Sequence, residues 1–136
     1  MDFKIGKGKS VFDFSNHMFG SEHEVLSQFD GQDFHILIKD GGEDILRVIF
    51  KFCVYQSFCR GTTVSISKFL ADIKYPNNEL IMYSESESAD AYNKYYSSII
   101  GGGGELNLRQ YGVFFSDERI SFNVISKDFS IETLTL

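Results

Sequence analysis

Two apolar runs on either side of an Asp-Gly-Gly triplet form the clearest pattern along the chain. The segment 34–55 reads FHILIKDGGEDILRVIFKFCVY, and each run is long enough for a β-strand. Glycine adopts the positive φ angles that a tight hairpin turn requires. One face of the second run is wholly apolar and consists of Leu46, Val48, Phe50, Phe52 and Val54. This two-residue period predicts an antiparallel hairpin whose second strand buries that face in the core.

Shorter alternating runs predict more strands on both sides of the hairpin. They cover residues 1–14, 64–66 and 79–83 and, from 105 onward, a three-strand meander with turns near 116–118 and 126–128. Such repeated alternation is typical of antiparallel sheets with one face on the core. We therefore predict one mainly β domain over residues 1–136. Its architecture is an antiparallel β-sandwich or a strongly curved sheet of about seven to nine strands, with one or two short helices.

Two segments carry signals of a helix. Ser21 and Glu24 have the spacing of a capping box, which predicts a short helix over residues 21–29. In the second segment Ser88 is the expected N-cap. The apolar stripe of that helix, at positions i, i+3, i+4 and i+7, consists of Tyr92, Tyr95, Tyr96 and Ile99. A strand over residues 95–100 is the alternative for this segment.

The net charge narrows the classes of partner. The 136 residues carry a formal net charge of −6, whereas binding to nucleic-acid phosphates requires clustered Lys and Arg. We therefore expect no nucleic-acid partner, and a basic protein partner is favoured. The chain contains 14 Phe and 7 Tyr but no Trp, a composition that suits strands and disfavours a carbohydrate site.

The start of the chain and its cysteines bear on the compartment. The sequence begins without a hydrophobic signal region, and no apolar run approaches the ~20 residues that a membrane helix needs. We expect a cytoplasmic protein without membrane contact; a precursor with a cleaved leader is the alternative. The spacing C-x5-C of Cys53 and Cys59 matches neither a zinc site nor a redox motif, and it favours free thiols over a disulfide.

No set of ionisable residues forms a catalytic or metal-binding signature. His17, His23 and Glu24 could offer metal ligands, but the two histidines straddle a predicted turn, which favours separate surface side chains. Either cysteine with His35 could form a nucleophile pair, yet no orienting partner is visible. We therefore expect no catalytic residue, no metal and no cofactor, and we favour binding over catalysis.

Exposed carboxylates gather in two segments where a partner could reach them. The residues of this predicted partner-binding set are Glu85, Glu87, Asp90, Asp40, Glu43 and Asp44. Tyr92 and Tyr95 are the expected aromatic anchors, because Tyr is enriched at interface hot spots. A solvated loop without a partner is the alternative reading of the acidic segment 84–90.

In its size, its acidity and its central hairpin DFHILIKDGGEDILRVIFKF, the chain resembles bacterial immunity proteins of contact-dependent growth inhibition and related polymorphic toxin systems. The resemblance implies a cytoplasmic, non-catalytic antitoxin that neutralises a toxin domain by occluding its active site. It assigns a role to no particular residue. Three alternatives stay open: a small-ligand-binding β domain, a phage-type inhibitor of a host defence protein, and a hydrolase. An enzyme would bring His35 or His23 within hydrogen-bond reach of a Cys or carboxylate in a cleft.

Overall fold

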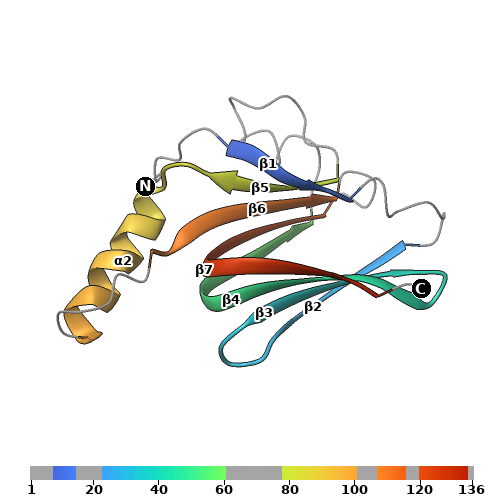
Figure 1. Ribbon diagram of the computed structural model, residues 1–136, viewed down its shortest axis with the longest axis horizontal. Coiled ribbons are helices and arrows are strands. Elements are labelled where there is room, and N and C mark those ends of the chain that lie inside the picture. Colours follow the sequence, from blue (N-terminus) through green and yellow to red (C-terminus); the bar gives the residue numbers. More distant parts are fainter. Residues whose placement is uncertain (1–7, 15–22, 61–77, 101–106, 116–119, 135–136) are drawn as a thin grey trace.

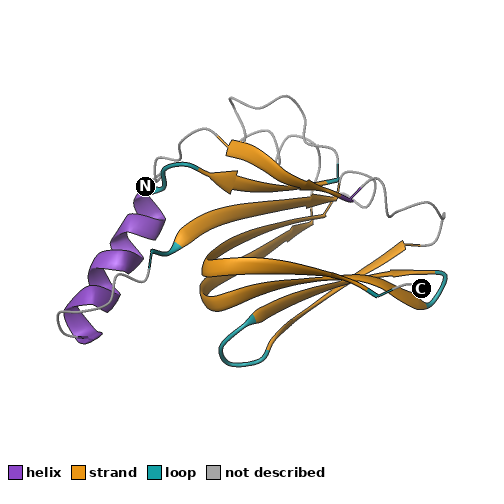
Figure 2. Ribbon diagram, in the orientation of Figure 1, coloured by secondary structure: helices purple, strands orange, loops and turns teal. Residues whose placement is uncertain are grey.

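The computed structural model describes residues 8–14, 23–60, 78–100, 107–115 and 120–134 (Figure 1). Within these ranges the chain forms seven β-strands and one α-helix. They are β1 (Gly8–Asp13), β2 (His23–Phe29), β3 (Phe34–Asp40), β4 (Glu43–Arg60), β5 (Glu79–Tyr83), α2 (Glu87–Ile100), β6 (Arg109–Phe115) and β7 (Ile120–Thr133). The predominance of strand, seen in Figure 2, confirms the predicted mainly β fold. The strand predicted at 64–66 lies outside the described residues. The turn predicted near 126–128 is wrong, because β7 runs without a break from Ile120 to Thr133 and pairs with β4 across these positions.

All seven strands belong to one antiparallel sheet with the order β1-β5-β6-β7-β4-β3-β2. The two long strands β4 and β7 pair with each other along most of their length. β3 pairs with residues 43–50 of β4, whereas β6 pairs with residues 120–126 of β7. Because β4 and β7 bend between these two regions, the sheet curves back over itself (Figure 1). The prediction of a sandwich or a strongly curved sheet is confirmed.

The side enclosed by the curved sheet holds the main hydrophobic core. Side chains from both halves of the sheet join in one cluster there, including Leu46, Val48 and Phe50 of β4, which are completely buried. The Phe50 ring packs against Tyr111 of β6 with 5.5 Å between ring centroids. Burial of each such side chain contributes roughly 1.5–3 kcal/mol, so this part of the predicted apolar face anchors the fold.

The predicted central hairpin is confirmed. β3 and β4 are joined by Gly41 and Gly42, whose φ angles are +60° and +86°. Positive φ at both turn positions matches the twist of the flanking strands, and glycine adopts it without steric cost. The Asp-Gly-Gly triplet therefore sets the register in which β3 faces β4.

The single apolar face predicted for the second run is wrong beyond Phe50. Phe52 has a φ of +51°, and the register with β7 shifts between Cys53 and Tyr55. This bulge moves Cys53 into the main core and turns Phe52 and Val54 to the outer side of the sheet. The outer cluster consists of Phe52, Val54, Ala89, Tyr92, Tyr96, Leu108 and Ile125. After the bulge β4 therefore contacts apolar clusters on both sides of the sheet, through Cys53 on the inner side and through the partly buried Phe52 and Val54 on the outer side.

The helix predicted over residues 21–29 is wrong, because residues 23–29 form strand β2. β2 pairs with β3 in unbroken register from the His23–Asp40 pair to the Phe29–Phe34 pair. Val25 packs against the main core from this strand. The backbone hydrogen bonds of the sheet and the burial of Val25 outweigh a local capping signal, which is worth only about 1 kcal/mol.

Candidate functional site

Helix α2 lies beside the bend of β4 and β7, on the outer side of the sheet (Figure 1). Ala89, Tyr92 and Tyr96 face the sheet and belong to the outer cluster. The strand alternative for residues 95–100 is therefore wrong. The predicted apolar stripe is confirmed only in part: Tyr92 and Tyr96 are half-buried against the sheet, whereas Tyr95 and Ile99 are 59% and 60% exposed.

Side-chain hydrogen bonds fix α2 at its start. The N-cap is Ser86 and not the predicted Ser88: its Oγ accepts the Ala89 N–H at 3.1 Å. The same hydroxyl donates to the side-chain oxygen of Gln110 on β6. The Gln110 amide in turn donates to Asn123 Oδ1 on β7 at 2.7 Å. These contacts hold the first turn of the helix against two strands.

A second pair of hydrogen bonds fixes the middle of α2. Asn93 Nδ2 donates to the Leu108 carbonyl at 3.1 Å, and Asn93 Oδ1 accepts the Leu108 N–H at 2.8 Å. The amide side chain thus satisfies both backbone groups of one residue, as a neighbouring strand would. With two such attachments, the outward side chains of α2 are presented by a well-held element.

The exposed surface of α2 combines charge with apolar side chains. Glu85 precedes the helix, and Glu87 and Asp90 lie in its first turn; all three are exposed. Negative charge at this end is favourable to the helix dipole. Tyr95 and Ile99, one turn apart, expose most of their side chains. Asp90 and Ile99 are nine residues, about two and a half turns, apart and so point to opposite sides of the helix. We call these five exposed residues the α2 face.

The other predicted members of the site lie differently. Tyr92 turns toward the sheet, where its ring lies 6.4 Å from that of Tyr55, so it supports the α2 face from behind. Asp40, Glu43 and Asp44 flank the β3–β4 turn, at the opposite end of the sheet from α2 (Figure 1). The two acidic groups therefore do not form one surface.

Two carboxylates of this second group contact basic side chains. Asp44 lies 3.3 Å from the Lys39 ammonium, and Asp40 lies 3.7 Å from His23 Nε2. Both contacts join neighbouring strands of the β2–β3–β4 region. The Lys39 charge reduces the local negative field of this turn, and the α2 face becomes the stronger candidate.

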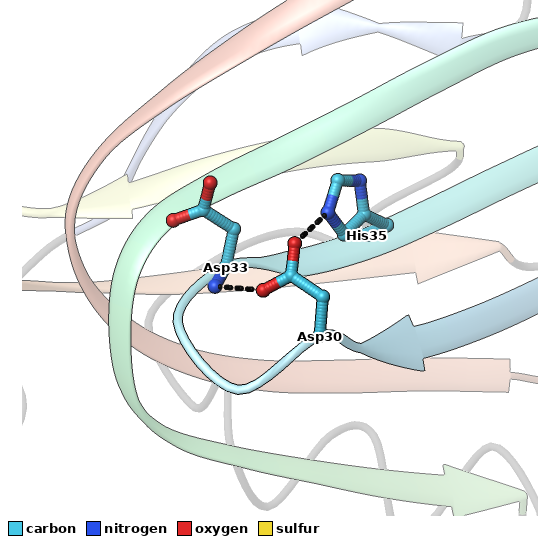
Figure 3. A group of neighbouring side chains, drawn as sticks. All are labelled: Asp30, Asp33 and His35. Atoms are coloured by element: carbon cyan, nitrogen blue, oxygen red, sulfur yellow. Dashed lines mark hydrogen bonds and ion pairs between the residues drawn. The ribbon is translucent and has the colours of Figure 1, made fainter.

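Asp30, Asp33 and His35 form a cluster at the β2–β3 turn that was not predicted from the sequence (Figure 3). His35 Nε2 lies 2.9 Å from Asp30 Oδ2. The other oxygen of Asp30 accepts the backbone N–H groups of Gln32 and Asp33, at 2.9 and 2.7 Å. The segment FDGQDF, residues 29–34, was predicted to begin at the end of a helix; as a turn between two strands it brings these side chains together.

The same turn is attached to the bend of β4. Asp33 Oδ1 accepts the Phe52 N–H at 3.0 Å, and the Gln32 carbonyl accepts the Cys53 N–H at 2.8 Å. Burial raises the pKa of the Cys53 thiol to about 11, and the Asp33 charge acts in the same direction. Cys53 is therefore protonated near neutral pH and is a poor nucleophile.

The cluster has the residue types and the spacing of a metal site: two carboxylates and an imidazole, whose ligand atoms lie within 4.8 Å of one another. His35 and Asp30 also lie within the hydrogen-bond distance of a histidine and a carboxylate that the enzyme alternative required. Each of the three side chains, however, already has a hydrogen-bond partner within the protein. Holding the turn and the β4 bulge accounts for the arrangement. Of the other proposed ligands, His17 lies outside the described residues, and His23 contacts Asp40.

We expect the Asp30 contacts to make part of the stability sensitive to acid. The backbone N–H of Asp33, then His35 and the Gln32 N–H, lower the pKa of Asp30 to about 2 from its usual 3.8. The stabilisation is complete above the unfolded-state pKa and disappears as the pH falls from about 3.8 toward 2. Urea unfolding of wild type and Asp30→Asn at several pH values should show wild type more stable at about pH 5, with a gap that closes toward pH 2. A gap that stays constant would contradict this assignment.

Comparison of the chain with protein-family models, with curated proteins and with solved structures gave no match. No helix among the described ranges is long and apolar enough to cross a lipid bilayer. Both cysteines are free thiols, as their spacing predicted.

Proposed function

We propose that this protein is a non-catalytic inhibitor that binds a basic protein partner in the cytoplasm, in the manner of an immunity protein that occludes a toxin domain. The observation that carries the proposal is the α2 face, with three exposed carboxylates at the start of the helix and two exposed apolar side chains in its second half. Exposed apolar anchors together with charge on the same element are the composition of a hot spot with a polar rim.

The carboxylates of the α2 face act mainly on the rate of encounter. The chain has a net charge of −6, and Glu85, Glu87 and Asp90 concentrate part of it at the start of the helix that carries the anchors. Clustered charge of one sign accelerates association with a partner of the opposite sign, and salt weakens the effect. A basic partner is thus drawn to the part of the surface where Tyr95 and Ile99 can make contact.

The apolar side chains act mainly on the lifetime of the complex. Tyr95 lies edge-on to Tyr96 with 5.3 Å between ring centroids, and Tyr96 in turn packs edge-on to Phe52 at 5.9 Å. The exposed ring is therefore supported by a row of aromatic side chains that reaches the β4 bulge. A side chain that is already ordered loses less entropy on binding.

Charge reversal at the α2 face tests the proposal. We expect Glu85→Lys, Glu87→Lys and Asp90→Lys together to slow association with the basic partner by about tenfold or more at low salt. The partner is first isolated on immobilised wild-type protein and identified, and association is then measured by surface plasmon resonance at several salt concentrations.

Tyr95→Ala should instead accelerate dissociation of the complex, by roughly tenfold, in the same measurement.

The second acidic group provides the matched control. Asp40→Lys, Glu43→Lys and Asp44→Lys change the net charge by the same amount at the other end of the sheet. We expect this variant to slow association much less than reversal at the α2 face. Equal effects of both triple variants would mean that only net charge matters, and no effect of either would reject the charge argument altogether.

A further inference from the structure

The structure has two outer strands, β1 and β2, which differ in their suitability for pairing with another strand. Among the described residues, β2 pairs only with β3, and β1 pairs only with β5. An outer strand presents backbone N–H and C=O groups along its free side, and proteins commonly block such edges with bulges, charges or proline. β1 and β2 differ in how many of these blocking features they carry.

β1 carries features that block edge pairing. Its register with β5 shifts between Ser10 and Phe12, which marks a bulge or irregularity, and its six residues include Lys9 and Asp13. An irregular, charged strand is a poor template for a further strand. We therefore do not expect β1 to join β2 of another molecule head to tail, an arrangement that would build open filaments.

β2 has no register shift, and its one carboxylate, Glu24, lies near its start. Its seven residues stay in unbroken register with β3, and the stretch 25–29 contains no charge and no proline. Two large apolar side chains of this strand are exposed, Leu26 by 41% and Phe29 by 45%. Phe29 pairs with the buried Phe34 and so shares the inner side of the sheet, whereas Leu26 pairs with Leu37 on the outer side. Both sides of this edge thus offer apolar surface to a further strand.

We propose that β2 pairs with β2 of a second copy of this chain, antiparallel and about a two-fold axis at Leu26. In this register Leu26 faces Leu26 of the partner, Val25 faces Ser27, Glu24 faces Gln28, and His23 faces Phe29. No charged side chain opposes a like charge, which is unfavourable across strands. The two-fold axis keeps both enclosed cores on the same side of one continuous sheet, and the contact closes on itself as a dimer.

The α2 face stays accessible in this dimer. α2 packs beside the bend of β4 and β7, whereas β2 is the outermost strand at one edge of the sheet, separated from β4 by β3 (Figure 1). The dimer therefore carries two α2 faces and is independent of the proposed inhibitory function. One pair of seven-residue strands is a small interface, so we expect a dimer that dissociates on dilution.

Sedimentation of the purified full chain tests the dimer. We expect the mass of two chains at the upper end of a micromolar-to-millimolar concentration series and the mass of one chain at the lower end. Leu26→Lys places two ammonium groups opposite each other and should weaken the dimer by roughly tenfold or more. Ile99→Lys, the same change at an exposed apolar residue of α2, should leave it intact. A single-chain mass throughout, or a dimer sensitive to Ile99→Lys and not to Leu26→Lys, would overturn the proposal.

Cross-linking tests the register separately. In a Cys59→Ser background, which removes the more accessible native thiol, Leu26→Cys should form a disulfide-linked dimer under mild oxidation. Directly opposed residues of paired strands have the separation that a disulfide needs. Gln28→Cys should not cross-link, because the two copies of position 28 lie roughly 13 Å apart along the strands. Equal cross-linking of both variants would reject this pairing.

Discussion

Replacing Phe50 with alanine is expected to lower the free energy of unfolding by about 3–5 kcal/mol. Phe50 is completely buried just before the bend of β4. Its ring stacks on Phe34 with 6.4 Å between centroids and also packs on Tyr111 of β6. It therefore joins the two halves of the curved sheet. Because small domains are stable by only about 5–15 kcal/mol, this loss is a large share of the stability, and urea unfolding followed by circular dichroism measures it.

The same strand offers a control for this prediction. Phe58 lies in the second half of β4 and is 51% exposed, with a ring contact to Phe122 at 5.3 Å. Phe58→Ala removes an identical group from a poorly enclosed site and should cost less than about 1.5 kcal/mol. Similar losses for the two variants would mean that the enclosed side of the sheet is not the main source of stability.

The parts of the fold that follow from local pattern were predicted well. The apolar alternation in β3 and the first half of β4 needs only the period of a strand, and the Asp-Gly-Gly turn needs only the conformational freedom of glycine. Both signals lie within residues 34–50. A strongly curved or doubled sheet followed from the number of such strands, because one apolar face of each must be covered.

The parts that depend on distant contacts were not predicted. Residues 23–29 carry a capping signal, and only the pairing with β3 makes them a strand. Phe52 continues an apolar alternation, and only the attachment of the β2–β3 turn makes it a bulge. In both cases a tertiary hydrogen bond outweighs a preference of the local sequence.

The candidate site was predicted from composition, and the structure sorts its members. Acidic residues and tyrosines were visible in the sequence, but the sequence could not say which tyrosines the sheet would cover. That depends on the rotation of α2, which Ser86 and Asn93 fix through contacts with residues far along the chain. The Asp30–Asp33–His35 cluster was missed because its turn was predicted to follow a helix and not to join two strands.

Replacing Asp33 with alanine is expected to destabilise the protein by about 1–3 kcal/mol, because it leaves the part-buried Phe52 N–H without its acceptor. Phe52 adopts a φ of +51°, a conformation that costs a residue with a side chain about 1–3 kcal/mol and persists only when its surroundings hold it. Asp33 is one of those holding contacts. Urea unfolding measures the loss, and amide hydrogen exchange should show the Phe52 N–H exchanging faster.

The effect of Asp33→Ala should also reach helix α2. The Phe52 ring packs edge-on against Tyr96, which supports Tyr95 of the α2 face. Once the bulge relaxes, we expect amides of α2 near Tyr96 to exchange faster as well. Asp33→Asn keeps an oxygen that can accept the same N–H and should fall between wild type and Asp33→Ala. Asp44→Ala, which removes an exposed ion pair with Lys39, should cost less than about 1 kcal/mol. If exchange rose at Phe52 but not in α2, the helix would be held by Ser86 and Asn93 alone, and the turn would have no influence on the α2 face.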